Sequence, residues 1–261
     1  MNLLEINNLS IGYKRNIIFP NITLAENAPC LVALVGSNGR GKSTLLKTIA
    51  GLEHSCGGEF LFEGKTLSSL SPKAKSELLA FVGSTIERAD YLSVEEMLSI
   101  NAYYRTNWLG SITPEEKQSI RDALKMVGLE GFENRQSSNL SDGEYQRVTI
   151  AGALVQNSKI ILLDEPTAFL DIANKFLISK LLRTIAHQEK KLIIFSTHDL
   201  RLAMEVADKL WVMTSSEIVS DTPENLLRDA KSNGGVGSAL DNMFEVEGVT
   251  FDASLKSFVF Q

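Results

Sequence analysis

The chain has 261 residues, of which 44% are hydrophobic and 22% are charged, the composition of an ordinary globular protein with a sizeable core. Its formal net charge of -6 at pH 7 argues against nucleic acid or an anionic membrane surface as a partner, because both favour a basic face. No apolar stretch approaches the roughly 20 residues that span a bilayer, and the opening MNLLEINNLS lacks the features of a signal peptide.

The N-terminal third combines predicted strands with a short helix. Strands are predicted at residues 3–11, 21–24, 30–35, 58–67 and 78–83, the fourth of them with a turn. A helix is predicted over residues 42–52, KSTLLKTIAGL, with its end at Gly51. Cys30 and Cys56 lack the spacing of a metal site, so we expect two free thiols in a reducing cytoplasm.

The middle of the chain, from about residue 86 to residue 154, is predicted to be mainly helical. Thr113 and Glu116 have the spacing of a capping box, which marks the start of a helix. Ser141 and Glu144 repeat this device at the start of a second helix. We therefore expect a helical subdomain inserted at about residues 86–154.

Buried strands alternate with helices in the second half. Strands are predicted at residues 159–164, 191–197 and 209–213, and helices at residues 172–188 and 199–207. Apolar runs separated by helices predict a mostly parallel sheet with helices on both faces. The tail is predicted to form a short helix at 222–230 and a terminal hairpin at 244–260, and we expect the extension 222–261 to pack on the core.

The glycine-rich stretch GSNGRGKST follows a predicted strand and opens a predicted helix. It matches the pattern G-x-x-x-x-G-K-[ST], in which backbone N–H groups and a helix N-terminus surround phosphates. The residues predicted to bind a nucleotide are Gly36, Ser37, Asn38, Gly39, Arg40, Gly41, Lys42, Ser43 and Thr44. Lys42 would bring its positive charge to the β- and γ-phosphates, and Ser43 would offer a hydroxyl to Mg²⁺. The alternative is a glycine-rich turn with a surface lysine.

The fold class predicted from these elements is α/β, with a P-loop NTPase core over residues 1–221 that includes an N-terminal antiparallel β part. Asp164 and Glu165 end a buried strand within it, at the edge of the sheet where ligands bind. We expect Asp164 to hold Mg²⁺ and Glu165 to activate the attacking water. Because adjacent strand residues point to opposite faces, the two carboxylates should differ in role.

His198 ends the next predicted strand, within FSTHDL. If the two strands are neighbours, the imidazole lies beside Asp164 and Glu165 and can donate to the γ-phosphate. Taken alone, each of these motifs has a structural alternative: carboxylates often occupy strand–helix turns, and His198 could be a capping or buried structural histidine.

The stretch LSDGEYQRV, residues 140–148, completes a motif set with the phosphate loop, LLDEPTAFLD and STHDL. In their order along the chain, these motifs resemble the nucleotide-binding subunit of an ATP-binding cassette (ABC) transporter, and the resemblance covers nearly the whole chain. The resemblance implies that Ser141 and Gly143 bind the γ-phosphate of a nucleotide held by a second subunit. It also implies that Asp171 crosses the dimer interface and that Tyr13 stacks on adenine; the alternative for Tyr13 is an exposed turn residue.

Three positions depart from the family pattern, and for one of them, Gly152 where the family often has an arginine, the sequence offers no physical explanation. Asp142 stands where the family has a glycine, and an acid there would repel a γ-phosphate unless its side chain points away. After the strand at 78–83 the family carries a glutamine that touches Mg²⁺, whereas this chain has Ser84 or Thr85. We expect metal contact at Ser84 to be weaker or mediated by water.

The resemblance implies a function and its partners. It predicts an ATP- and Mg²⁺-dependent ATPase that closes head to tail with a second copy of itself and drives integral membrane permease subunits. Among importers, the sequence is most similar to the group for iron–siderophore, haem and cobalamin uptake, which implies a substrate-binding protein and a location at the cytoplasmic face of the cell membrane. The alternatives are a cassette ATPase outside transport, in cofactor assembly or on the ribosome, and a nucleotide-binding regulator with slow turnover.

Overall fold

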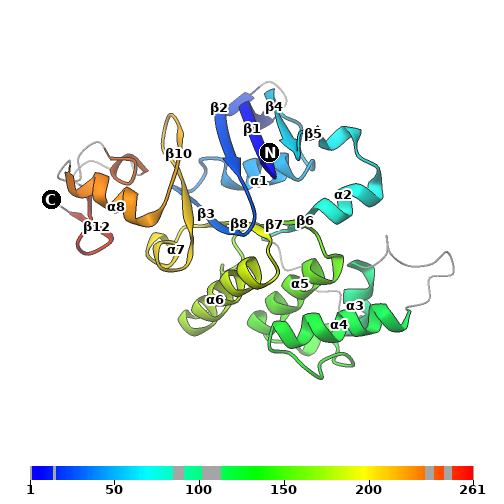
Figure 1. Ribbon diagram of the computed structural model, residues 1–261. Coiled ribbons are helices and arrows are strands. Elements are labelled where there is room, and N and C mark those ends of the chain that lie inside the picture. Colours follow the sequence, from blue (N-terminus) through cyan, green and yellow to red (C-terminus); the bar gives the residue numbers. More distant parts are fainter. Residues whose placement is uncertain are drawn as a thin grey trace.

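The computed structural model describes residues 2–13, 16–84, 91–101, 113–232, 238–243 and 249–260. Over this part of the chain, the central feature is a six-stranded sheet in the order β10-β9-β3-β8-β7-β6 (Figure 1). Its strands are β3 (Cys30–Gly36), β6 (Leu79–Val82), β7 (Ile160–Leu163), β8 (Leu192–Thr197), β9 (Lys209–Met213) and β10 (Ile218–Asp221). Neighbours from β9 to β6 pair in parallel, and β10 is antiparallel to β9.

The central strands are apolar runs because both of their faces are covered. Every residue of β3, β7 and β8 is buried. Alternate side chains of one strand enter different cores: Leu31 and Val35 face one hydrophobic cluster, and Val32 and Leu34 face the other. This two-sided burial is the reason that the runs lack a period of two, and the prediction of a parallel sheet is confirmed.

One face of the central sheet is covered by an antiparallel sheet together with a helix. The antiparallel sheet has the order β2-β1-β4-β5 in the described residues and consists of β1 (Leu4–Tyr13), β2 (Asn16–Glu26), β4 (Gly57–Phe62) and β5 (Lys65–Thr66). Helix α1 (Lys42–Ile49) buries Leu45, Leu46 and Ile49 in the hydrophobic cluster that contains Val32 and Leu34 of β3. The short helices η1 (Leu67–Ser69) and α2 (Pro72–Leu78) follow. The predicted N-terminal antiparallel part is therefore present.

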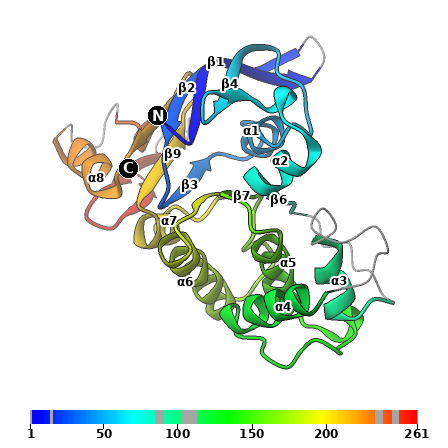
Figure 2. The ribbon, with the colours of Figure 1, turned by 45° about the vertical axis from the view of Figure 1, so that its right-hand side comes forward.

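The opposite face carries a second set of helices. These are α5 (Asp142–Gln156), α6 (Ile172–Gln188) and α7 (Leu200–Val206), with α3 (Val94–Asn101) and α4 (Pro114–Met126) beside α5 and the 3-10 turn η3 (Ser137–Asn139) before it (Figures 1 and 2). Both predicted capping boxes are present, at Thr113 and at Ser141. Residues 86–90 and 102–112 of the predicted helical subdomain lie outside the described residues, and its boundaries remain a prediction.

The C-terminal part lies beside β9 and β10. It contains α8 (Pro223–Ser232), the 3-10 turn η4 (Asp241–Met243), and a hairpin of β11 (Val249–Asp252) and β12 (Ser257–Phe260). Leu226 and Ala230 of α8 belong to the same hydrophobic cluster as Val212. Strand β10 was not predicted, because its sequence IVSD is too short to give a strand signal, and it pairs with β9 in the structure. Within the described part, no helix is both long and apolar enough to cross a membrane.

Candidate active site

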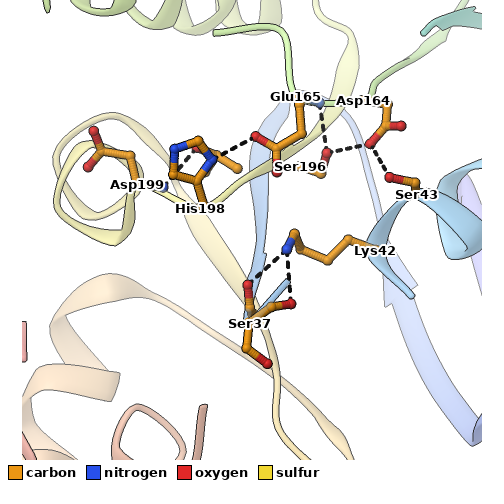
Figure 3. Close-up of polar contacts among 10 residues, drawn as sticks. Ser37, Lys42, Ser43, Asp164, Glu165, Ser196, His198 and Asp199 are labelled. Atoms are coloured by element: carbon orange, nitrogen blue, oxygen red, sulfur yellow. Dashed lines mark hydrogen bonds and ion pairs between the residues drawn. The ribbon is translucent and has the colours of Figure 1, made fainter. Parts of the chain in front are cut away.

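The predicted site residues follow strands that are neighbours in the sheet. The phosphate loop follows β3, His198 follows β8, the pair Asp164–Glu165 follows β7, and Ser84 follows β6. Because these strands are parallel and adjacent, their carboxyl ends lie at one edge of the sheet. Residues more than a hundred positions apart are thereby brought into contact (Figure 3).

Two glycines allow the phosphate loop to take its path. Gly41 has φ 106°, a conformation that other residues rarely adopt, and it precedes the first residue of α1. A Cβ at Gly36 would lie 3.0 Å from the carbonyl oxygen of Met213 on β9, so a side chain there would force the two strands slightly apart. In the described residues, no side chain caps α1, and its N-terminal N–H groups are available to an anion.

Lys42 lies across the loop that precedes it. Its side chain is buried, and Nζ donates hydrogen bonds to the carbonyl oxygens of Gly36 at 2.8 Å and Ser37 at 3.2 Å. Burial lowers the pKa of Lys42, and the nearby carboxylates of Glu165 and Asp164 act in the opposite direction. The ammonium group is thus held beside the loop by neutral acceptors that phosphate oxygens can replace.

Asp164 and Ser43 form an oxygen-rich corner at the start of α1. The Ser43 hydroxyl donates to Oδ1 of Asp164 at 2.8 Å, and the Asp164 side chain is buried. A hydroxyl and a carboxylate oxygen fit Mg²⁺, which binds few protein groups and completes its shell with water and phosphate. In the described part of the chain, no group of three or more histidine, cysteine or acidic side chains forms a metal cluster of its own.

Glu165 does not continue the strand. β7 ends at Leu163, and Glu165 has φ 49°, so the alternation argument for the two carboxylates is wrong. The chain bends at these two consecutive residues instead. Asp164 is buried against Ser43, whereas Oε2 of Glu165 lies 3.1 Å from Nδ1 of His198. The expected proximity of His198 to Glu165 is present, because β7 and β8 pair directly.

Ser196 completes this corner, and sequence reasoning did not identify it. Its hydroxyl donates to Oδ1 of Asp164 at 2.8 Å and accepts from the backbone N–H of Glu165, also at 2.8 Å. The residue is fully buried in β8. The available signal was a hydroxyl within the apolar run LIIFST, two residues before His198.

Tyr13 and Ser84 lie at the margin of the site. The hydroxyl of Tyr13 is 3.3 Å from Oγ1 of Thr44, and about half of the Tyr13 surface is exposed, so stacking on adenine remains a prediction.

The remaining loop residues are more exposed. Asn38 and Gly39 are exposed, and Nε of Arg40 donates to Oγ of Ser37 at 3.1 Å. Ser84 is exposed just beyond Val82, whose carbonyl accepts from the N–H of Asp164. Thr85 lies outside the described residues.

The residues predicted to act on a second subunit begin two helices. Ser141 caps α5 and exchanges hydrogen bonds with Glu144, and Asp171 caps α6 and accepts from Asn174. Ser141 and Asp171 are exposed, whereas Gly143 is buried. These hydrogen bonds engage each residue with its own helix rather than with the phosphate loop. Asp142 is exposed in the first turn of α5.

Comparison with known proteins places the chain in a family. The family model for ABC transporters matches residues 19–168. The achromobactin transport ATP-binding protein CbrD of Dickeya dadantii is 33% identical over 85% of this chain and 83% of its own length. The iron(3+)-hydroxamate import ATP-binding protein FhuC of Bacillus subtilis is 30% identical over 85% and 82%.

A solved structure agrees with this assignment. The dimeric ATP-binding cassette MJ0796, bound to ADP and phosphate, has a TM-score of 0.72 with 26% identity, covering 84% of this chain and 98% of that one. Its bound ligands are those of an ATPase after hydrolysis. The chain therefore belongs to the ABC transporter family, as an ATP-binding subunit with ATPase activity.

Proposed function

We propose that this chain powers an importer for an iron–siderophore, haem or cobalamin-type compound. The observation that carries the proposal is the convergence of Lys42, Asp164 and Glu165 at one edge of the sheet, with His198 against Glu165. The names of its relatives CbrD and FhuC, which refer to achromobactin and iron(3+)-hydroxamate, support the substrate class.

The hydrolytic step can be assigned to residues of this chain. The loop N–H groups and Lys42 would bind the triphosphate and balance the charge that develops on it. Mg²⁺, held by Ser43 and Asp164, would neutralise phosphate charge when bound. Glu165 would take a proton from the water whose oxygen attacks the γ-phosphorus, as the bond to the bridging oxygen breaks. His198 would orient Glu165 and donate to the γ-phosphate.

Two copies of the chain would work together, head to tail. Ser141, Gly143 and Asp171 would reach the ATP that is held by the partner subunit, so that ATP closes the pair and hydrolysis opens it. The dimer of the related cassette MJ0796 supports this arrangement. Integral membrane permease subunits would receive the motion at the cytoplasmic face of the membrane, and a substrate-binding protein would deliver the compound from outside.

The two alternatives predict different behaviour. A cassette ATPase outside transport would not co-purify with a permease, and the importer names of CbrD and FhuC favour transport. A slow-turnover regulator has no need of a positioned base, and the contact between Glu165 and His198 favours turnover.

The decisive experiment compares the wild type with Glu165→Gln and Lys42→Ala. We expect the wild type to hydrolyse ATP, and Glu165→Gln to bind ATP without turnover and to form dimers detectable by light scattering. Lys42→Ala should lose ATP binding in calorimetry. A wild type that does not bind ATP in the presence of magnesium would overturn the proposal.

A further inference from the structure

The first turns of α5 and α6 touch at Gly143 and Asn174. A Cβ built on Gly143 would lie 2.8 Å from Oδ1 and 2.9 Å from Cγ of Asn174, which is closer than carbon atoms can pack. The absence of a side chain at Gly143 therefore lets the carboxamide of Asn174 lie directly against the start of α5. Gly143 is buried and Asn174 is half-buried.

The same carboxamide is fixed to the residue that begins α6. Nδ2 of Asn174 donates to Oδ2 of Asp171 at 3.0 Å, and the backbone N–H of Asn174 donates to Oδ1 at 2.7 Å. The backbone bond alone suffices to cap the helix. The side-chain bond adds a different property: it orients the amide between Asp171 and Gly143.

At residue 174, an amide side chain fits better than a carboxylate or an apolar side chain of similar size. A carboxylate would face Asp171 at hydrogen-bond distance and repel it, whereas leucine, similar in size, could not donate to it. The end of the Asn174 side chain already occupies the space that a Cβ at Gly143 would need. The contact therefore depends on a short, neutral donor at residue 174 and on glycine at residue 143.

We propose that Asn174 is a positioning residue that holds two helix caps, Ser141 before α5 and Asp171 before α6, in one fixed arrangement for contact with the second subunit. Ser141 lies two residues before Gly143, which contacts Asn174, and Asp171 accepts a hydrogen bond from Asn174. Asn174 therefore connects two residues, Ser141 and Asp171, that are both exposed. The inference rests on the proposed function, because it assumes that these two residues meet the partner's nucleotide. Asn174 itself touches neither ATP nor the reacting atoms in this account.

The test measures ATP-driven dimerisation in a Glu165→Gln background. We expect Asn174→Ala to raise the ATP concentration at the dimerisation midpoint roughly five- to tenfold, as expected for the loss of one solvent-exposed hydrogen bond. ATP binding by the monomer, measured by calorimetry at low protein concentration, should change less than about twofold, because the phosphate loop is untouched. Asn174→Asp, which keeps the shape but reverses the polarity, should be impaired at least as much.

Asn225 supplies a matched control. At the start of α8, its Nδ2 donates to Oδ1 of Asp221 at 2.8 Å, and its backbone N–H donates to Oγ1 of Thr222. Asn225→Ala therefore removes the same kind of bond from another helix start, and the dimerisation midpoint should not move. Thermal unfolding of both alanine variants shows whether the two losses of stability are equal.

A double variant tests the contact with Gly143. Gly143→Ala should also impair dimerisation, through its own proposed contact with the partner's ATP and because its methyl group displaces the carboxamide. Since the carboxamide is then already displaced, adding Asn174→Ala should produce no further loss. Additive losses would overturn the inference, and so would a dimerisation midpoint for Asn174→Ala equal to that of its parent. If the Glu165→Gln parent binds ATP but does not dimerise, the proposed head-to-tail function fails, and the inference fails with it.

Discussion

Nδ1 of His198 lies 3.1 Å from Oε2 of Glu165, joining the turn after β7 to the end of β8 (Figure 3). The Glu165 side chain is 19% exposed, and that of His198 is 52% exposed. A carboxylate in a turn has several available rotamers, and this contact selects one of them. The imidazole thus restrains the proposed base while about half of its own side chain stays exposed.

Replacing His198 with alanine should lower kcat by about 10²- to 10³-fold, the usual effect of removing one donor from a transition state. ATP affinity should change little, because Lys42 and the loop amides are retained. Steady-state kinetics and calorimetry separate the two effects. His187→Ala is the matched control: His187 is also partly exposed and also faces a carboxylate, with Nε2 3.0 Å from Asp208. Equal losses of kcat in both variants would contradict the assignment.

Ser196→Ala should reduce kcat by about 10- to 100-fold, since both Asp164 and the N–H of Glu165 lose a fixed partner. The unpaired groups should also lower the free energy of unfolding by about 1–3 kcal/mol. Ser179→Ala is the control, because in the described structure Oγ of Ser179 is buried without a hydrogen-bond partner. That variant should keep full activity. Unaltered turnover in Ser196→Ala would show that Ser196 does not orient Glu165.

The sequence predicted the parts of the site that depend on local pattern. The strand–loop–helix order around Lys42 and the capping residues Thr113 and Ser141 follow from short-range chemistry. The approach of His198 to Glu165 required only that β7 and β8 be neighbours. These features are readable because each depends on one element or on one pair of strands.

Other features depend on contacts between distant segments. Ser196 contacts Glu165 only because β8 places it against the turn after β7, and Asn174 lies against Gly143 only because α5 begins beside it. The left-handed conformation of Glu165 is likewise unpredictable from an acidic pair after an apolar run. A single sequence holds no record of these distances, so the strand-alternation argument gave a wrong reason for the difference between the two carboxylates.

The two cysteines should differ sharply in reactivity. Burial raises the pKa of Cys30 from 9.0 to about 12, with further increases from the charges of Glu26 and Asp208. At pH 8 this thiol stays protonated, and the thiolate is the reactive species. Iodoacetamide should therefore modify the partly exposed Cys56 in the native protein and both cysteines in guanidinium, as read by intact mass. Native Cys56→Ser should remain unmodified, and rapid alkylation of its Cys30 would contradict the burial argument.

Glu26 links the two sheets through a buried carboxylate. Oε1 accepts from Nε1 of Trp211 at 3.1 Å and from Oγ of Ser220 at 3.1 Å, and Oε2 accepts from Nζ of Lys209 at 2.8 Å. The Glu26 side chain is 1% exposed, so its charge is compensated by these donors rather than by water. Hydrogen bonding to Glu26 raises the pKa of Lys209. Strand β2 is thereby tied to β9 and β10.

Glu26→Gln should lower the free energy of unfolding by about 2–4 kcal/mol, because Lys209 loses its partner and the new amide N–H₂ group meets other donors. Urea denaturation gives this value directly. Glu63→Gln is the matched control: Glu63 lies 2.6 Å from Lys159, but both side chains are about half exposed, so the loss should stay below about 1 kcal/mol. Equal losses at the two positions would mean that burial does not set the strength of the Glu26 contacts.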